Sequence, residues 1–172
     1  ATPPLGPRQP QLVCDCGNAP GALSAPHSLR RLGCAVTELY SEPDGNFPNH
    51  HPAPTKRENL PKLIETVLET GADFGVGFDG DADRIGVVDE RGEVIWGDRL
   101  MALYWTEILP KHPGAVAICE VKSSMALPAT VETYGGRPLW WKAGPSLVTA
   151  TLRQEHAPLS AEVSGHMISA AL

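Results

Sequence analysis

Three aspartates at alternate positions, Asp79, Asp81 and Asp83, form a dense cluster of negative charge, and Arg84 follows directly. Only glycine and alanine separate the acids, so the backbone can turn all three carboxylates toward one centre. Their mutual repulsion would be costly there without a counter-ion. Ligation by oxygen alone favours a hard divalent cation, Mg²⁺ or Ca²⁺, over zinc. The spacing therefore predicts a metal loop, and a guanidinium beside a metal suits a ligand such as phosphate that bridges both.

Two other interpretations of this stretch remain open from the residues alone. Counted from Asp79, acids at positions 1, 3 and 5 and Glu90 at position 12 match a calcium loop of the EF-hand type. Position 6 of such a loop must be glycine but is Arg84 here, and the flanks are expected to be strands rather than helices. The other interpretation is a solvated acidic turn, which does not require three acids in register followed by an arginine.

The acidic loop is expected at the exit of a strand, because the apolar segment 73–78 leads directly into it. The other expected strands are 11–15, 34–39, 85–89, 93–96, 115–121, 137–141 and 159–163, and the expected helices are 22–33, 59–71, 97–110, 123–136 and 145–156. For helix 59–71 we expect Asn59 as the cap, Pro61 in the first turn and Gly71 at the end. The long proline-rich segment 40–58 has no periodicity, and such loops are usually functional or disordered.

Strands that alternate with helices along the whole chain indicate an α/β fold with largely parallel sheets. The pattern occurs twice. We therefore expect two consecutive related α/β domains, residues 1–92 and 93–172, each with a mixed, largely parallel sheet flanked by helices. The second domain is expected to be incomplete, because few residues follow its strand at 159–163.

Composition excludes several classes of function. The net charge is -6, and lysines and arginines adjoin only in pairs, so nucleic acid is not an expected partner. No apolar run approaches the roughly 20 residues that a membrane span needs, and the first residues do not resemble a secretory signal. The four cysteines lack metal-ligand spacing, so we expect reduced, buried thiols in a cytoplasmic protein.

Five segments together resemble the α-D-phosphohexomutases, in particular the bacterial phosphomannomutase/phosphoglucomutase branch. They are VCDCGN (13–18), EPDGNFPNHHP (42–52), DGDADR (79–84), EVKSS (120–124) and AEVSGH (161–166). They follow the family's order with similar spacing across nearly the whole chain. In such enzymes a phosphoserine donates its phosphate to a hexose phosphate, the bisphosphorylated sugar turns over in the cleft, and phosphate moves between the 1 and 6 hydroxyls.

The resemblance implies catalytic roles for Arg84, Lys122 and His166, substrate binding by Lys122, Glu162, Ser164 and Gly165, and Mg²⁺ bound by Asp79, Asp81 and Asp83. Arg84 would stabilise charge or help with proton transfer, and Lys122 would contact the sugar or its phosphate as a point charge. Glu162 and Ser164 would bind adjacent sugar hydroxyls. His166 would act as a general acid or base. Without the resemblance, Lys122 would be read as a solvated lysine.

The sequence departs from the family in ways that bear on activity. It contains no serine-histidine-asparagine-proline motif for the phosphoserine, and it lacks the family's fourth domain. Pro145 follows a glycine where the family usually has histidine, and Pro20 stands where glycine is common. We therefore expect a chain that needs the missing first and fourth domains as partners and does not complete a catalytic cycle alone. The alternative is a non-catalytic module that binds sugar phosphate or metal.

The expected ligand is glucose or mannose 1- or 6-phosphate, with the bisphosphate as intermediate and glucosamine phosphate as an alternative.

His50 and His51 could suggest a metal site, but adjacent side chains on an extended chain point opposite ways. We interpret them as packing and hydrogen-bonding residues of the loop. Trp140 and Trp141 are interpreted as part of a half-buried strand rather than a platform for sugar stacking.

Overall fold

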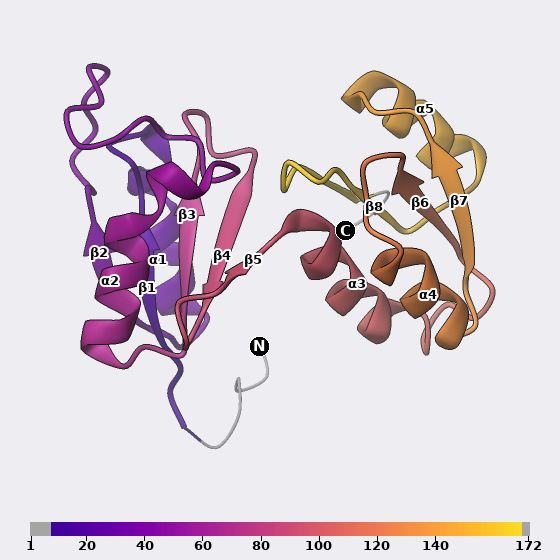
Figure 1. The fold of residues 1–172 in the computed structure, drawn as a ribbon, viewed down its shortest axis with the longest axis horizontal. Coiled ribbons are helices and arrows are strands. Elements are labelled where there is room, and N and C mark those ends of the chain that lie inside the picture. The colour runs from indigo at the N-terminus through magenta and orange to yellow at the C-terminus, as the bar shows by residue number, and fades with distance from the viewer. Residues whose placement is uncertain (1–7, 170–172) are drawn as a thin grey trace. The chain divides into compact units, whose positions relative to one another are not determined.

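A computed structural model describes residues 8–169 of the chain. The chain divides into two compact units, Ala1–Ile95 and Trp96–Leu172 (Figure 1). Each unit contains its own sheet with helices packed on it. This arrangement agrees with the α/β fold and the repeated pattern expected from the sequence.

The first unit is built on a five-stranded sheet with the order β2-β1-β3-β4-β5. Its elements are β1 (Gln11–Asp15), η1 (Pro20–Leu23), α1 (Ala25–Arg31), β2 (Ala35–Leu39), η2 (Arg57–Asn59), α2 (Pro61–Thr70), β3 (Phe74–Phe78), β4 (Ile85–Asp89) and β5 (Val94–Ile95). Strand β1 runs parallel to both β2 and β3, whereas β4 and β5 continue the sheet antiparallel. The acidic loop joins the antiparallel pair β3 and β4.

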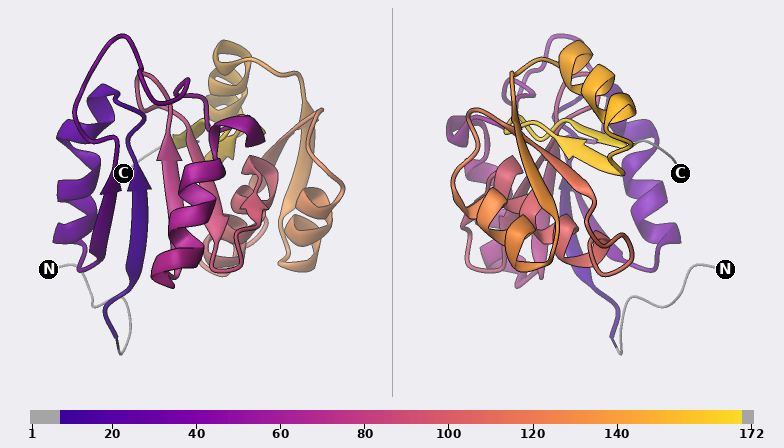
Figure 2. Two further views of the ribbon diagram at one scale, coloured as in Figure 1. Left: turned by 60° about the vertical axis from the view of Figure 1, so that its left-hand side comes forward. Right: turned by 90° about the vertical axis from the view of Figure 1, so that its right-hand side faces the viewer.

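Helices α1 and α2 lie on opposite faces of this sheet (Figure 2). The core beneath α2 consists of Val13, Leu60, Leu63, Val67, Ala72 and Val88. A side chain at Gly75 would place its Cβ 2.7 Å from both Leu63 and Val67, so this glycine lets the helix approach β3 closely. The close contact fixes the strand that leads into the acidic loop.

The second unit has a four-stranded sheet with the order β7-β6-β8-β9. Its elements are α3 (Gly97–Ile108), β6 (Val116–Glu120), α4 (Ala126–Thr133), β7 (Arg137–Trp141), α5 (Pro145–Gln154), β8 (Leu159–Ala161) and β9 (Met167–Ser169). Strand β6 is parallel to β7 and β8, and β9 pairs antiparallel with β8. This order repeats that of the first four strands of the first unit.

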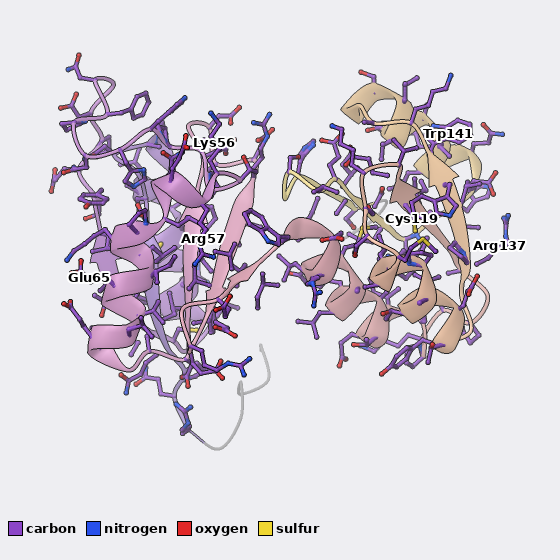
Figure 3. All side chains as sticks on the ribbon, viewed as in Figure 1. Lys56, Arg57, Glu65, Cys119, Arg137 and Trp141 are labelled. Carbon is purple, nitrogen blue, oxygen red and sulfur yellow. The ribbon has the colours of Figure 1, made fainter. Side chains whose placement is uncertain are left out.

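Strand β6 is buried along its whole length, because helices cover both faces of its sheet. Ala117 and Cys119 face the core formed with α3 and α4, whereas Val116 and Ile118 face the core beneath α5. This alternation is the period of two that a strand imposes on its side chains. Figure 3 shows Cys119 inside the unit.

The structure corrects two expectations about the elements. Asn59 is not the cap of α2: Leu60 occupies that position without a side-chain hydrogen bond, and the Asn59 amide instead donates to the Ala53 carbonyl at 2.9 Å. Gly71 does end the helix, with a left-handed φ of 64°. Strand β9 had not been expected. It is only three residues long and is defined by its pairing with β8.

All four cysteines are free and buried, in agreement with the expected reduced thiols. The Cys14 and Cys16 sulfurs lie 3.8 Å apart, and this contact together with burial raises the pKa of the Cys14 thiol. Burial raises the pKa of Cys119 to about 11. Within residues 8–169, none of the helices has the length and apolar character needed to cross a membrane.

Candidate functional site

The acidic loop brings its three carboxylates together at the exit of β3. One oxygen from each of Asp79, Asp81 and Asp83 lies within 4.8 Å of the others. The Ala82 N–H donates to the Asp79 carbonyl at 3.1 Å, which closes a tight turn. Ala82 has a left-handed φ of 62°, an unusual conformation for a residue with a side chain. The convergence expected from the alternating acids is confirmed.

Asp79 is the inner member of this group. It is 5% exposed, whereas Asp81 and Asp83 are exposed. Burial raises the pKa of the Asp79 carboxyl, the charges of Asp83 and Asp81 raise it further, and the hydrogen bond from the Arg84 N–H opposes them. A buried carboxylate with two acidic neighbours is a favourable ligand for a cation. The cation offsets both the cost of burying the charge and the repulsion between the acids.

Arg84 is oriented toward the same acids. Its backbone N–H donates to Asp79 Oδ1 at 3.1 Å, and its guanidinium lies 3.6 Å from carboxylate oxygens of both Asp79 and Asp83. The side chain is half exposed, so the guanidinium keeps donors for an anion that approaches the loop.

The geometry fits a hard cation but not an EF-hand. The donor set consists of carboxylate oxygens only, which Mg²⁺ and Ca²⁺ prefer. The loop lies between strands β3 and β4 rather than between two helices, so the calcium-loop alternative fails on its flanks. A freely solvated acidic turn is also a poor description, because Asp79 is buried.

In the second unit, the candidate residues gather where parallel strands end. Lys122 follows β6, and the turn 162–166 joins β8 to β9. Because β6 and β8 are neighbouring parallel strands, their carboxyl ends lie at one edge of the sheet. Side chains from these two connections can therefore act on one ligand.

The turn 162–166 is held largely by Glu162. Its carboxylate accepts the Gly144 N–H at 3.2 Å and the Ser164 hydroxyl at 3.4 Å, and it lies 3.6 Å from His166 Nδ1. The Gly165 N–H donates to the Glu162 carbonyl, and Gly165 has a φ of 82° that glycine tolerates best. All four expected residues of this turn thus belong to one hydrogen-bonded unit.

Glu120 was missed by the sequence reasoning. It is the last residue of β6 and is 3% exposed. One of its carboxylate oxygens accepts the Val163 N–H at 2.8 Å, and the other lies 3.4 Å from the Lys122 ammonium. Glu120 therefore links the exposed Lys122 to the turn 162–166. The available signal was an acid at the end of a fully apolar strand.

Two residues at the start of α3 support the same region and were also missed. Asp98 is buried and accepts the Ser124 N–H at 2.8 Å, which fixes the turn that follows Lys122. A Cβ on Gly97 would lie 2.7 Å from the Val163 carbonyl oxygen and 2.8 Å from that of Glu162. Only glycine allows the helix to begin this close to the turn.

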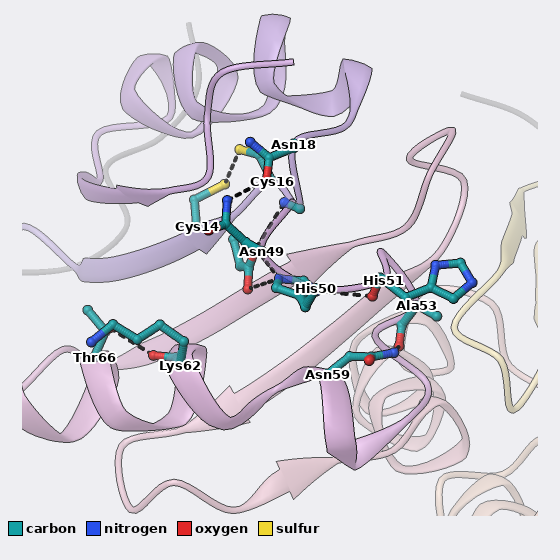
Figure 4. Close-up of polar contacts among 12 residues, drawn as sticks. Cys14, Cys16, Asn18, Asn49, His50, His51, Ala53, Asn59, Lys62 and Thr66 are labelled. Atoms are coloured by element: carbon teal, nitrogen blue, oxygen red, sulfur yellow. Dashed lines mark hydrogen bonds and ion pairs between the residues drawn. The ribbon is translucent and has the colours of Figure 1, made fainter. Parts of the chain in front are cut away.

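The remaining candidates occupy other positions in the two units. The His50 ring bonds to Asp15 in the first unit, and His51 is exposed with its ring directed away from that of His50 (Figure 4). Trp140 and Trp141 lie on β7 and are 41% and 38% exposed (Figure 3). Pro145 is the first residue of α5. The acidic loop belongs to the first unit, and Lys122 and residues 162–166 belong to the second.

Comparison with known families gives two adjacent matches. The family model described as phosphoglucomutase/phosphomannomutase, alpha/beta/alpha domain II, matches residues 3–92, and that for domain III matches residues 96–171. A phosphomannomutase/phosphoglucomutase from Pseudomonas syringae pv. tomato is 47% identical over 160 residues, which is 93% of this chain and 34% of the relative. The chain thus spans about a third of the length of such relatives.

Solved structures with the same fold include two that bear on the argument. A phosphoglucomutase/phosphomannomutase family protein from Burkholderia thailandensis superposes with a TM-score of 0.92 at 44% identity, covering 95% of this chain and 36% of that one. An Aspergillus fumigatus N-acetylphosphoglucosamine mutase, in complex with GlcNAc-6P and magnesium, gives a TM-score of 0.66 at 19% identity, covering 92% and 33%. The second likeness concerns the fold alone.

Proposed function

The chain belongs to the phosphoglucomutase/phosphomannomutase family, and we propose that it supplies the metal loop and part of the hexose-phosphate site of a phosphohexomutase. The proposed reaction moves phosphate between the 1 and 6 hydroxyls of a hexose, by way of a bisphosphorylated sugar and an enzyme phosphoserine. The serine and the grip on the distal phosphate would come from the first and fourth domains, which are the expected partners of this chain.

The convergence of the three aspartates is the observation that carries this proposal. Asp79, Asp81 and Asp83 would hold Mg²⁺, and their all-oxygen donor set within 4.8 Å supports that choice. The magnesium complex of the Aspergillus fumigatus mutase is a further support from a protein of the same fold. A bound divalent cation would neutralise negative charge on the phosphoryl group during transfer.

Arg84 would hold an oxygen of the phosphate group next to the acids. Its guanidinium already lies 3.6 Å from Asp79 and Asp83, so the carboxylates orient it before a ligand arrives. A planar guanidinium offers paired donors that match two phosphate oxygens. Arg84 would thereby position the phosphate and stabilise its charge.

The sugar hydroxyls would be recognised by Glu162, Ser164 and His166. Each oxygen of a carboxylate has two lone pairs, so Glu162 can bind sugar hydroxyls while it accepts from Gly144 and Ser164. Gly165 lets the turn close around these groups. His166 lies close enough to Glu162 for its ring to be oriented, as proton transfer to or from a hydroxyl requires. The exposed Lys122 would attract the phosphate of the same ligand.

We propose glucose or mannose 1- or 6-phosphate as the ligand, with glucosamine phosphate as the alternative. The names of relatives such as the Pseudomonas syringae enzyme favour the first pair. Free buried cysteines suit a reducing compartment, so we place the function in the cytoplasm. Phosphorylation would affect the serine of the first domain rather than this chain.

Binding experiments test these assignments on the 172-residue chain. Mn²⁺, a spin-active substitute for Mg²⁺, is titrated while free Mn²⁺ is followed by electron paramagnetic resonance. Asp81→Asn should weaken binding at least about tenfold, because one of three ligands loses its charge. Glucose 1-phosphate is titrated separately and observed by amide NMR. Glu162→Gln and Lys122→Met should each weaken its binding. Unchanged affinities in these variants would contradict the assigned roles.

A turnover assay separates the enzyme part from an independent binding module. The chain alone should not interconvert glucose 1-phosphate and glucose 6-phosphate, since it contains no serine-histidine-asparagine-proline motif. Adding the first and fourth domains of a relative should restore activity. If the chain binds sugar phosphate specifically but never supports turnover with those domains, the module becomes the better description.

A further inference from the structure

The turn that follows β1 lies at the same sheet edge as the acidic loop. Asp15 is the last residue of β1, and it aligns with Gly77 of β3, two residues before Asp79. Strands β1 and β3 are parallel neighbours, so their carboxyl ends lie side by side. Groups attached to the end of β1 can therefore influence the geometry of the loop at the end of β3.

The buried Asp15 pairs with the partly buried His50 across 35 positions of sequence. Asp15 is 2% exposed, and its two carboxylate oxygens lie 3.2 and 3.1 Å from His50 Nε2. Asp15 also accepts the Gly17 N–H at 2.9 Å, which shapes the turn after the strand. Without His50, this buried carboxylate would lose the partner that lies close to both of its oxygens.

The other His50 nitrogen is also engaged. Nδ1 lies 3.0 Å from the His51 carbonyl oxygen, which can only accept (Figure 4). Both ring nitrogens therefore face acceptors, an arrangement that the doubly protonated imidazolium satisfies. The hydrogen bond to Asp15 raises the pKa of His50, in keeping with this geometry. The Tyr40 ring contacts the imidazole edge-on at 5.2 Å between centroids.

Further hydrogen bonds hold the segment before His50 to the same turn. The Asn49 amide donates to the Asn18 side-chain oxygen at 2.7 Å (Figure 4). The Asn18 amide in turn donates to the Glu42 carbonyl at 2.8 Å. The Asp44 N–H donates to the Asn18 carbonyl at 2.8 Å. These contacts attach the proline-rich segment to the turn, and His50 is the member of this attachment that reaches the Asp15 carboxylate.

Two prolines that follow His50 lie near the acidic loop and the strands that carry it. Pro52 approaches Gly17 closely, because a Cβ added there would lie 3.0 Å from its ring, whereas a Cβ added at Gly80 would fit at an ordinary contact distance of 3.7 Å. Gly80 separates Asp79 from Asp81. Pro52 therefore lies near the loop between two of its acids, with room for about one methyl group between them.

Pro54 supports the loop at its base. Gly77 and Gly86 are register partners in the β3–β4 pair, just outside the loop. A Cβ on Gly86 would lie 2.7 Å from Pro54, and one on Gly77 would lie 3.5 Å from it. Because a proline ring is rigid, movement of this segment would be passed to the strands that carry the acids.

We propose that the Asp15–His50 pair is a brace for the acidic loop: it fixes residues 50–54 so that Pro52 and Pro54 hold the three aspartates in their converged arrangement. His50 and Asp15 are positioning residues in this account, and neither contacts the metal ligands. The expected effect on metal affinity rests on the proposed metal-binding function. The expected effect on the conformation of the loop does not.

The adjacent histidines provide a matched pair of variants for the test. His50→Phe keeps an aromatic ring beside Tyr40 but loses both hydrogen bonds, whereas His51→Phe changes an exposed ring. In the 172-residue chain, His50→Phe should weaken Mn²⁺ binding about tenfold, the lower end of the cost of losing an outer-shell partner. His51→Phe should bind Mn²⁺ as the wild type does. His50→Gln, which retains a donor for Asp15, should recover part of the loss.

Hydrogen exchange supplies a second readout that does not depend on metal. His50→Phe should exchange the Ala82 and Arg84 amides faster than the wild type, while core amides of α2 keep their protection. Unchanged Mn²⁺ affinity together with unchanged exchange at these two amides would overturn the brace. If His50→Phe loses protection throughout the unit, it has unfolded generally, and His50→Gln becomes the deciding variant. Wild-type Mn²⁺ affinity and wild-type exchange in His50→Gln would support the brace. Wild-type folding of His50→Gln with fully impaired Mn²⁺ affinity would contradict it.

Asp81→Asn distinguishes failure of the brace from failure of the proposed function. If this variant binds Mn²⁺ as tightly as the wild type, the metal assignment falls and the brace is judged by exchange of the loop amides alone. A different outcome would leave the metal site standing and show the brace to be wrong. Asp81→Asn would lose Mn²⁺ affinity, whereas His50→Phe would keep wild-type affinity and wild-type exchange of its loop amides.

Discussion

Ala82 packs against Gly21, and a side chain at Gly21 would place its Cβ 3.0 Å from the Ala82 Cβ. Ala82 also has a left-handed φ of 62°, a conformation that glycine adopts more readily than alanine. Gly21 belongs to η1. Because Gly21 has no side chain, there is room beside it for the methyl group of Ala82. The acidic loop is thereby in contact with the segment that follows β1.

A double-mutant cycle tests this complementarity. Gly21→Ala should lower the free energy of unfolding by about 1 kcal/mol, because the two methyl groups would be overpacked. The same change in an Ala82→Gly background should cost markedly less, since the opposing methyl is gone. Urea denaturation of the four proteins measures the coupling. Equal costs in both backgrounds would show that the two residues do not constrain each other.

Neutralising one acid of the loop should affect stability in opposite ways with and without metal. In metal-free buffer, Asp81→Asn should raise the free energy of unfolding by about 0.5 kcal/mol, because repulsion of the buried Asp79 is reduced. At saturating Mg²⁺ the wild type should gain more stability than the variant. Thermal melts with and without Mg²⁺ give both values. Glu69→Gln, an exposed change on α2, should alter neither, and a wild type insensitive to Mg²⁺ would argue against the site.

Glu120 should stabilise the turn 162–166 mainly through its hydrogen bond. Glu120→Ala leaves the Val163 N–H without its acceptor and should cost about 2 kcal/mol, whereas Glu120→Gln keeps an acceptor and should cost about 1 kcal/mol less. The lost contact with Lys122 should add little, because that lysine is exposed. Denaturant titration and exchange of the Val163 amide measure the two effects. Equal damage from both variants would point instead to the charge of Glu120.

The His50 pair predicts a definite pH dependence of stability. The hydrogen bond to Asp15 raises the folded-state pKa of His50, so its stabilisation is complete below the ordinary histidine pKa of about 6.5. It should be lost as the pH rises through the higher folded value. Groups facing His50 are Asp15 from β1, the Tyr40 ring and the His51 carbonyl.

Comparison with His50→Phe isolates this contribution from that of the other histidines. The difference in unfolding free energy between wild type and variant should be largest near about pH 6 and should shrink toward higher pH. Denaturant titrations across that range measure it. A difference that stays constant or grows with pH would contradict a protonated His50 in the fold.

Much of the scaffold could be predicted because local signals and tertiary structure agree. Strands 11–15 and 137–141 have the bounds expected from their apolar runs and flanking turns, and Gly71 ends α2 as expected. Asn59 failed as a cap because its amide found a tertiary partner in Ala53, which no local pattern reveals. The three residues of β9 carry too little periodicity to be recognised without β8 beside them.

The candidate site divides in the same way. Convergence of the three aspartates followed from their alternation along one loop. Glu120 and Asp98 were not recognised, because their partners Val163 and Ser124 lie 43 and 26 positions away. His50 was expected to pack and form hydrogen bonds within the loop, and it does, but its partner Asp15 could not be predicted because the loop has no periodicity. Long-range contacts of single polar residues could not be predicted, because no local sequence pattern indicates them.

The repeated strand order, β2-β1-β3-β4 in one unit and β7-β6-β8-β9 in the other, separates what is maintained from what can vary. In each unit the apolar ladder forms the framework, and the candidate ligand-binding residues lie on connections beyond its ends. Evolution can therefore alter ligand preference by exchanging a connection while the framework keeps its folding free energy. Under the proposed function, two copies of one framework would serve different ligands: a cation at the loop of the first unit and a sugar at the turn of the second.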